Sequence, residues 1–266
     1  MSTDPIISFT SDFGSREYYV GAVKGAILSV APSARLVDIS HEIGSHDLLE
    51  GAFTLFGAYS TFPMRTIHLV VVDPGVGSSR RALIVSSSNY YFVAPDNGVL
   101  SLIYSREEIT RVISIEAGHY FREPVSPTFH ARDIFGPVAA WIARGIDIGK
   151  FGPEVSDYVR LALPPPQAAG DKRLEGIILH IDKFGNAITN LSPENIQAAA
   201  GKDGPPTRIV IDQAEIKHHY DYYCEAPGDE LFSLVGSSGF YEIAALKKSA
   251  ARLLNTKRGA KVILEW

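Results

Sequence analysis

Short apolar runs alternate, over the first 160 residues, with stretches in which apolar residues recur at helical spacing. The apolar runs predict six strands, at residues 6–10, 36–40, 66–73, 82–88, 90–94 and 112–116. Helical spacing predicts helices at residues 19–30, 47–60 and 134–144. The run HLVVVD is apolar on both faces, as expected for a strand covered by helices on both sides. The pattern therefore predicts an α/β fold, with an α/β/α sandwich in this part of the chain.

A proline-rich segment separates this part from the rest of the chain. Residues 164–172 (PPPQAAGDK) begin with three prolines, which have no amide hydrogen to donate. After them come short strand-like runs and one helix near residues 247–254; the runs are GIILHID, RIVID, ELFSLVG, FYEIAAL and KVILEW. We therefore expect an N-terminal α/β domain (1–163), a linker (164–172) and a smaller β-rich C-terminal domain (173–266).

Composition is that of an ordinary globular protein. The 266 residues are 45% hydrophobic and 21% charged, and the formal net charge is -5. This charge argues against non-specific nucleic-acid binding, which needs an excess of Lys and Arg on some face. The single cysteine, Cys224, excludes an internal disulfide and a thiolate metal cluster. Neither a secretory signal nor an apolar run of about 20 residues is evident. We therefore expect a soluble cytoplasmic protein.

Polar residues follow two of the predicted strands, at the ends where open α/β sheets bind ligands. The segment SFTSDFGS places Asp12 after the first strand, either as a carboxylate that accepts ribose hydroxyls or as a turn or helix-cap residue. The segment VVVDPGVGSSRRALIV places Asp73 before a tight turn and Arg80 and Arg81 before the next strand. Its alternative is a surface hairpin with two solvated arginines.

Three further segments carry candidate chemistry. In TFHARDIFGP, His130 and Asp133 lead into a helix; the alternatives are a structural histidine and a helix-capping aspartate. In IDKFGNAITN, an aromatic residue next to an amide suits a planar base, although the same pattern is typical of a hairpin loop. The loop GSSGFYEIA (236–244) either wraps the carboxylate and ammonium of a ligand with backbone groups or is only a turn.

Taken in order, these segments resemble the S-adenosylmethionine (SAM) hydroxide adenosyltransferase, or SAM hydrolase, family from about residue 6 to the C-terminus. The segments that carry the resemblance are TSDFG, DISHEIGSHDLLEGA, VVDPGVGSSRRALI, APDNGVLS, TFHARDIFGP, IDKFGNAITNL and GFYEIA. The family is a sister of the fluorinase and chlorinase, which attack the same carbon with a halide. The resemblance implies that water or hydroxide attacks ribose C5′ of S-adenosyl-L-methionine to give adenosine and L-methionine.

The resemblance also implies an assembly and residue roles. It implies an N-terminal α/β domain, a C-terminal β-barrel-like domain and a homotrimer, with each site between the N-terminal domain of one subunit and the C-terminal domain of its neighbour. Asp12 would hold the ribose hydroxyls. The C-terminal domain would supply Asp182 for the methionine amine, Phe184 and Asn186 for adenine, Ser237 or Ser238 for the methionine carboxylate, and Ala244, whose backbone reads the adenine edge, with Glu242 beside it.

The implied catalytic set is Asp73, Arg80 and His130. Asp73 would accept a hydrogen bond from the water, and Arg80, or less favourably Arg81, would keep Asp73 ionised. His130 would orient the water or carry its proton away, and the destination of that proton stays open. Because a sulfonium leaves as a neutral thioether, the leaving group needs no general acid, and we expect neither a metal nor a cofactor.

A 5′-halogenase is the first alternative, and two positions argue against it. Halogenases carry tyrosine where this chain has Asp73, and the fluorinase threonine that touches fluoride is replaced here by Val76. A carboxylate repels a halide anion, whereas it orients or partly deprotonates water. The chain departs from the family at His46, in a region where members usually present an aromatic or apolar wall to the nucleoside.

A non-catalytic adenosine or SAM-binding protein is the second alternative. It would use Asp12, Phe184 and Asn186 but would have no use for the catalytic set. A dinucleotide oxidoreductase is disfavoured because no GxGxxG follows the first strand. A zinc enzyme is disfavoured because the eight histidines are scattered. We expect SAM as the substrate partner and neither nucleic acid nor membrane as a partner.

Overall fold

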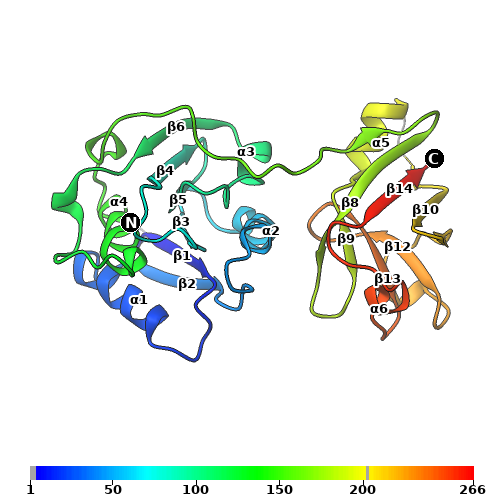
Figure 1. Ribbon diagram of the computed structural model, residues 1–266, viewed down its shortest axis with the longest axis horizontal. Helices are drawn as coiled ribbons and strands as arrows, with labels where there is room; N and C mark the ends of the chain where they lie inside the picture. Colours follow the sequence, from blue (N-terminus) through cyan, green and yellow to red (C-terminus); the bar gives the residue numbers. More distant parts are fainter. Residues whose placement is uncertain (1–3, 202–203) are drawn as a thin grey trace. The chain divides into compact units, whose positions relative to one another are not determined.

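The computed structural model describes residues 4–201 and 204–266 of the chain (Figure 1). Its contacts divide the chain into two compact units, the first ending at Leu161 and the second beginning at Ala162. None of the helices in the two described ranges is long and apolar enough to cross a membrane.

A mixed six-stranded sheet in the order β2-β1-β3-β5-β4-β6 forms the centre of the first unit (Figure 1). Its strands are β1 (Ile6–Ser11), β2 (Arg35–Ser40), β3 (Ile67–Val71), β4 (Ala82–Ser87), β5 (Tyr91–Pro95) and β6 (Ile109–Ser114). Strands β2, β1, β3 and β5 are parallel, and β4 runs antiparallel to both β5 and β6. The parallel strands bring their carboxyl ends, and the residues that follow them, to one edge of the sheet.

Helices cover both faces of this sheet, as predicted. Apolar residues of α1 (Tyr19–Val30) and α4 (Gly136–Ala143) pack with one face in a core that includes Ile27, Phe9 and Val138. On the other face α2 (Leu48–Ala58) and α3 (Ile103–Arg106) pack over Val70 and Phe92. The 12-residue helix α1 has the predicted bounds because its apolar residues recur on one face.

Several boundaries differ from the prediction. Strand β3 ends at Val71, so Asp73 lies in the following turn. A 3-10 turn at Tyr59–Thr61 follows α2, and β6 begins three residues before the predicted strand at 112–116. The predicted helix at 134–144 begins instead within a π-helical turn, Ala131–Phe135, that leads into α4. Further 3-10 turns lie at Gly118–Tyr120 and Ile148–Lys150.

The second unit is an antiparallel, nearly closed β-barrel. Its strands run in the order β11-β10-β14-β8-β9-β13-β12, and β7 pairs with β8. Their bounds are β7 (Gln167–Ala168), β8 (Arg173–Ile181), β9 (Ala187–Thr189), β10 (Arg208–Ile211), β11 (Ala214–Ile216), β12 (Leu231–Val235), β13 (Tyr241–Ala245) and β14 (Lys261–Glu265). Beyond β11, His219 forms a bridge with Ser233 of β12, and this bridge brings the two ends of the sheet together.

Two helices complete the second unit, and the sequence analysis missed one of them. Helix α6 (Ala250–Leu253) lies within the predicted segment 247–254. Helix α5 (Pro193–Ala200) has no counterpart in the prediction. Its start is marked by a capping box between Ser192 and Asn195, and its end by Gly201 in the left-handed conformation. A short 3-10 turn, Tyr223–Glu225, precedes β12.

Candidate active site

A cavity of about 270 Å³ opens at the carboxyl ends of β1 and β3, and its lining comes entirely from the first unit. Asp12 follows β1, and Asp73 follows β3. The segment 128–131, which leads into the π-helical turn, forms another wall. Three residues predicted from separate parts of the sequence, Asp12, Asp73 and His130, therefore line one cavity.

Arg80 joins Asp73 to His130 beside this cavity. Its Nε donates to Asp73 Oδ1 at 2.8 Å, and its Nη2 donates to Asp73 Oδ2. The same Nη2 lies 2.9 Å from His130 Nδ1. The Asp73 side chain is 5% exposed and that of Arg80 is 10% exposed, so the pair is largely shielded from solvent. The interpretation of this segment as a hairpin with solvated arginines is therefore wrong.

The contact with Arg80 fixes the tautomer of His130. A guanidinium only donates hydrogen bonds, so His130 Nδ1 must accept, and in the neutral ring the hydrogen is then on Nε2. Burial lowers the pKa of His130, and the positive charge of Arg80 lowers it further. His130 is therefore a neutral ring whose remaining polar atom, Nε2, is a hydrogen-bond donor.

Arg81 has different partners from its neighbour. Its Nε donates to Asp96 Oδ2 at 2.8 Å, and its Nη1 donates to Asp157 Oδ1 at 2.7 Å. Asp96 also accepts the backbone N–H of Val159 at 2.8 Å. Arg81 therefore joins the start of β4 to the segment near residue 157, and the structure selects Arg80 over Arg81 as the partner of Asp73.

The turn that carries Asp73 packs directly against the loop that carries His130. Gly77 has a φ of +81°, a conformation that side chains other than glycine rarely adopt. A Cβ atom at this position would lie 2.4 Å from the carbonyl oxygen of Pro127. Glycine is therefore required here for two reasons, and the contact holds the two segments at a fixed spacing.

Asp12 lies in the lining directly after β1, whose Ser11 pairs with Val71 of β3, and it is not a helix cap, because α1 begins after Tyr18. The Asp12 side chain is 9% exposed, and its Oδ2 accepts the backbone N–H of His46 at 2.9 Å. The His46 ring itself is 72% exposed, and it lines the cavity at the position where the sequence departs from the family. His46 thus contributes a backbone donor to Asp12 as well as a polar wall.

An aromatic wall, which the sequence analysis did not identify, completes the lining. The rings of Phe13, Tyr19 and Phe129 all line the cavity and contact one another edge to face, with centroids 5.5–6.1 Å apart. Phe13 directly follows Asp12 in SDFG, and Phe129 directly precedes His130 in TFHA. This adjacency to candidate polar residues is the sequence signal from which the wall could have been predicted. Such a wall excludes water and offers apolar surface to a ligand.

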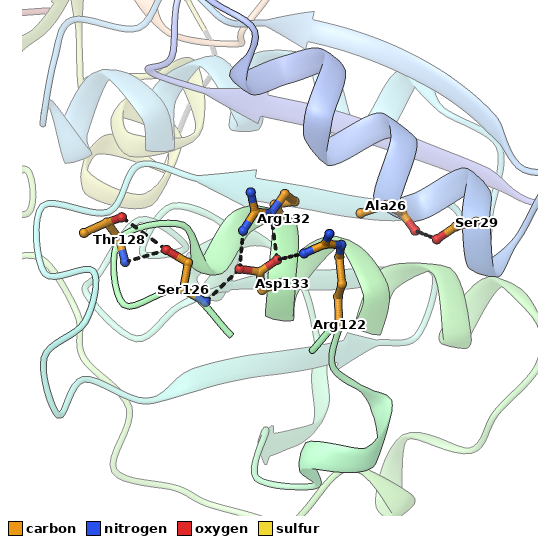
Figure 2. Close-up of polar contacts among 7 residues, drawn as sticks. All are labelled: Ala26, Ser29, Arg122, Ser126, Thr128, Arg132 and Asp133. Atoms are coloured by element: carbon orange, nitrogen blue, oxygen red, sulfur yellow. Dashed lines mark hydrogen bonds and ion pairs between the residues drawn. The ribbon is translucent and has the colours of Figure 1, made fainter. Parts of the chain in front are cut away.

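Asp133 is not among the residues that line the cavity, and it binds Arg122, Ser126 and Arg132, which precede and follow His130 in the chain (Figure 2). Its fully buried carboxylate accepts hydrogen bonds from Arg132 at 2.7 and 2.8 Å, from Arg122 at 3.2 Å and from the Ser126 backbone at 2.9 Å. Burial alone would raise the pKa of Asp133, but the hydrogen bonds from Arg132 and Ser126 hold this pKa below its usual range. Because Asp133 lies inside the π-helical turn, the helix-cap interpretation is wrong.

In the second unit, Asp182 organises the turn between β8 and β9. Its Oδ1 accepts the backbone N–H groups of Phe184 and Asn186 at 2.9 and 2.8 Å, and its Oδ2 accepts Asn186 Nδ2 at 2.9 Å. The Phe184 side chain projects outward and is 75% exposed, whereas Asn186 is buried. The predicted hairpin loop is present, and it presents an exposed aromatic ring beside a fixed amide.

The other predicted residues of this unit lie on and after β12. Ser237 and Ser238 are in the turn between β12 and β13, and Glu242 and Ala244 are buried within β13. Tyr223, which the sequence analysis missed, donates its hydroxyl hydrogen to Glu242 Oε1. Burial, together with the charge of Asp182, raises the pKa of the Glu242 carboxyl, against the lowering effect of this hydrogen bond.

Metal ligands are not grouped in the described part of the chain. Within residues 4–201 and 204–266, no three His, Cys, Asp or Glu side chains come together as a site that could hold a metal ion. The acidic side chains of the cavity have other partners, since Asp73 binds Arg80 and Asp12 binds the His46 amide.

Comparison with known proteins gives a consistent family for both units. Residues 7–152 match the SAM hydroxide adenosyltransferase N-terminal domain, and residues 176–263 match the C-terminal domain of the same family. An (R)-S-adenosyl-L-methionine hydrolase of Methanocaldococcus jannaschii is 34% identical over 94% of this chain and 92% of its own. A fluorinase of Actinopolyspora mzabensis is 25% identical over 97% of this chain and 96% of its own. The crystal structure of an uncharacterized conserved protein from Thermotoga maritima, 32% identical, gives a TM-score of 0.90 over 98% of this chain and all of that one.

Proposed function

The chain belongs to the SAM hydroxide adenosyltransferase family, and from this premise we propose that it is an (R)-S-adenosyl-L-methionine hydrolase. Water attacks ribose C5′ on the side opposite sulfur. The new C–O bond forms as the C–S bond breaks, the bonding electron pair goes to sulfur, and the products are adenosine and L-methionine. The observation that carries the proposal is the Asp73–Arg80–His130 set at the cavity wall.

Each member of this set has a role that follows from its hydrogen bonds. Arg80 donates to both carboxylate oxygens of Asp73 and so fixes the orientation of this carboxylate. His130 Nε2 donates a hydrogen bond to the oxygen of the attacking water and holds it in line with C5′, within about 3–3.5 Å. Asp73 accepts a hydrogen bond from the same water.

The proton of the water goes to Asp73 in this scheme. Arg80 has only donors, and His130 has its Nδ1 occupied and its Nε2 already protonated, so Asp73 is the one acceptor among the three. The water becomes strongly acidic as its oxygen bonds to carbon, and a carboxylate then takes the proton readily. The leaving thioether is neutral and needs no proton.

The lining of the cavity argues against a halide as nucleophile. Asp73 presents negative charge where the anion would enter, and Val76 offers a methyl surface in place of a donor. The aromatic wall of Phe13, Tyr19 and Phe129 excludes bulk water, which strengthens the charges that remain. Asp12, which also lines the cavity, accepts the ribose hydroxyls.

We extend the proposal to the assembly. In a homotrimer, the second unit of a neighbouring subunit would close each cavity with the predicted substrate-binding residues. Phe184 would stack on adenine with Asn186 beside it, and Asp182 would receive the methionine ammonium. The remaining contacts would come from Ser237 or Ser238, Glu242 and the backbone of Ala244. The exposed ring of Phe184 supports this role, because an aromatic ring in water gains from stacking.

The test is incubation of the purified protein with (R)-SAM in ¹⁸O-water, with and without chloride, followed by chromatography with mass detection. We expect adenosine with the heavy oxygen at C5′, formed equally in both samples. A halogenated nucleoside would assign the chain to the halogenases. Bound but unchanged SAM would assign it to non-catalytic binding proteins.

The neutral state of His130 predicts an acid limb in the pH profile. Its pKa lies below the usual 6.5, so the ring is neutral at pH 6.5 and above and becomes protonated only as the pH falls through the lowered value. A protonated Nδ1 cannot accept a hydrogen bond from Arg80, so the contact between Arg80 and His130 is lost. We expect kcat/KM to stay level above pH 6.5 and to fall on the acid side, as the pH passes through the lowered pKa of His130. A His130→Gln variant, which cannot be protonated, should lose this limb; an unchanged limb would assign it to another group.

A further inference from the structure

We infer that His41 is a positioning residue that holds the Asp12 loop, defined as residues 11–14, in the orientation needed for ribose binding. His41 is absent from the cavity lining and follows β2, the neighbouring strand of β1. It acts through Asp12 and Phe13, which do line the cavity. The inference rests on the proposed function, because it takes Asp12 as the acceptor of the ribose hydroxyls.

Two contacts with His41 bracket the two cavity residues. At the start of the loop, Ser11 Oγ lies 2.8 Å from His41 Nδ1. At its end, the Gly14 backbone N–H donates to the His41 carbonyl oxygen at 2.7 Å. Asp12 and Phe13 lie between these points, so a single residue holds both ends of the segment that enters the cavity.

The His41 ring is itself held in place from two further sides. Its Nε2 lies 3.0 Å from Asp38 Oδ1, and the ring packs edge to face on Phe9 at a centroid distance of 4.7 Å. Asp38 in turn binds Lys24 Nζ at 2.6 Å. The contact with Asp38 is an ion-pair distance, and the hydrogen bond of the His41 ring is the one between Nδ1 and the Ser11 hydroxyl.

Burial makes the Ser11–His41 contact consequential for the loop. Ser11 is fully buried and the His41 side chain is 9% exposed, so a lost hydrogen bond is not replaced by solvent. The Phe13 backbone N–H also points to Ser11 Oγ, at 3.4 Å. A carboxylate that must meet two hydroxyls needs to be held within about 0.5 Å, which is the kind of support that a second layer of contacts provides.

The test compares the Kd of adenosine with that of 2′,3′-dideoxyadenosine, measured by calorimetry on the intact protein. A purely structural role would weaken both nucleosides equally, whereas a misplaced Asp12 weakens only the one with hydroxyls. We expect the wild-type protein to prefer adenosine on the order of 10-fold or more, as for hydrogen bonds to a charged acceptor. His41→Phe and Ser11→Ala should bring the ratio close to one, and His41→Asn, which keeps a polar atom near the Nδ1 position, should restore part of it.

His68→Phe is the matched control. His68 is fully buried in β3, and its Nδ1 lies 2.7 Å from Ser8 Oγ, so it repeats the Ser–His contact of the same sheet at a distance from the loop. In the His68→Phe variant, the ratio of the Kd values of the two nucleosides should stay at the wild-type value. A wild-type ratio in His41→Phe, or in Ser11→Ala where His41→Phe does not fold, would overturn the inference. A wild-type protein that binds neither nucleoside would instead count against the proposed function.

Discussion

An Asp73→Asn variant is expected to lose about 10²–10⁴ in kcat for SAM hydrolysis, the usual contribution of a positioned acid–base group. Asparagine keeps the shape of the side chain but has one acceptor oxygen, so it cannot receive both Arg80 donors and a water hydrogen. It also cannot take the proton. Substrate affinity should change little, because Asp73 meets the water and not SAM, and single-turnover kinetics with a separate Kd measurement will separate the two.

Asp96→Asn is the matched control for this experiment. Asp96 Oδ2 accepts from Arg81 Nε and lies 2.7 Å from Arg81 Nη2, so Asp96 is also paired with an arginine, and its side chain is 4% exposed. It lies outside the cavity lining. We expect a less stable protein whose folded fraction retains wild-type kcat. Full hydrolysis by Asp73→Asn would remove Asp73 from the mechanism and leave the proton to solvent.

An Asp133→Asn variant is expected to lose about 2–4 kcal/mol in free energy of unfolding, from a buried charged acceptor with several donors. In asparagine an NH2 group, which can only donate, replaces one of the two accepting oxygens. This group would face N–H donors of Arg132, Arg122 or Ser126, which bind a carboxylate oxygen in the wild-type protein (Figure 2). The side chains of Arg122 and Arg132 are 48% and 26% exposed, so their guanidinium groups recover some hydration, which keeps the loss below that of a fully buried pair. Urea unfolding will measure it as a lower midpoint at an unchanged slope.

Asp157→Asn tests the same change at the surface. Asp157 also pairs with an arginine, Arg81 at 2.7 Å, but its side chain is 78% exposed. We expect its midpoint to match that of the wild-type protein, because solvent screens an exposed pair. Equal losses in the two variants would show that the burial of Asp133 has no special part in holding the His130 loop.

Local patterns were sufficient to predict the elements that bury one apolar face. Helix α1 and the buried strand β3 repeat apolar residues over at least five positions, so their periodicity is visible in the sequence. Strand β9 has three residues and shows no period. Helix α5 has few buried residues, so no apolar pattern predicts it. The sequence signal for this helix is its capping residues.

The candidate site was predictable in its residue types but not in its connections. Asp73, Arg80 and His130 were each ambiguous alone, because the contact between Arg80 and His130 spans 50 positions. The choice between Arg80 and Arg81, the tautomer of His130 and the contact of His41 with Ser11 all depend on distances across the fold. Composition and spacing carry no information on these distances.

The contact between Gly77 and Pro127 has a consequence for how such enzymes change their chemistry. The spacing between the Asp73 turn and the His130 loop is set by backbone atoms at a position without a side chain. In the proposed mechanism, exchanges at positions 73 and 76 would therefore alter which nucleophile enters while the frame around it stays the same. The spacing of the two segments and the choice of nucleophile therefore depend on different residues. A change of nucleophile would require new side chains but no change of fold.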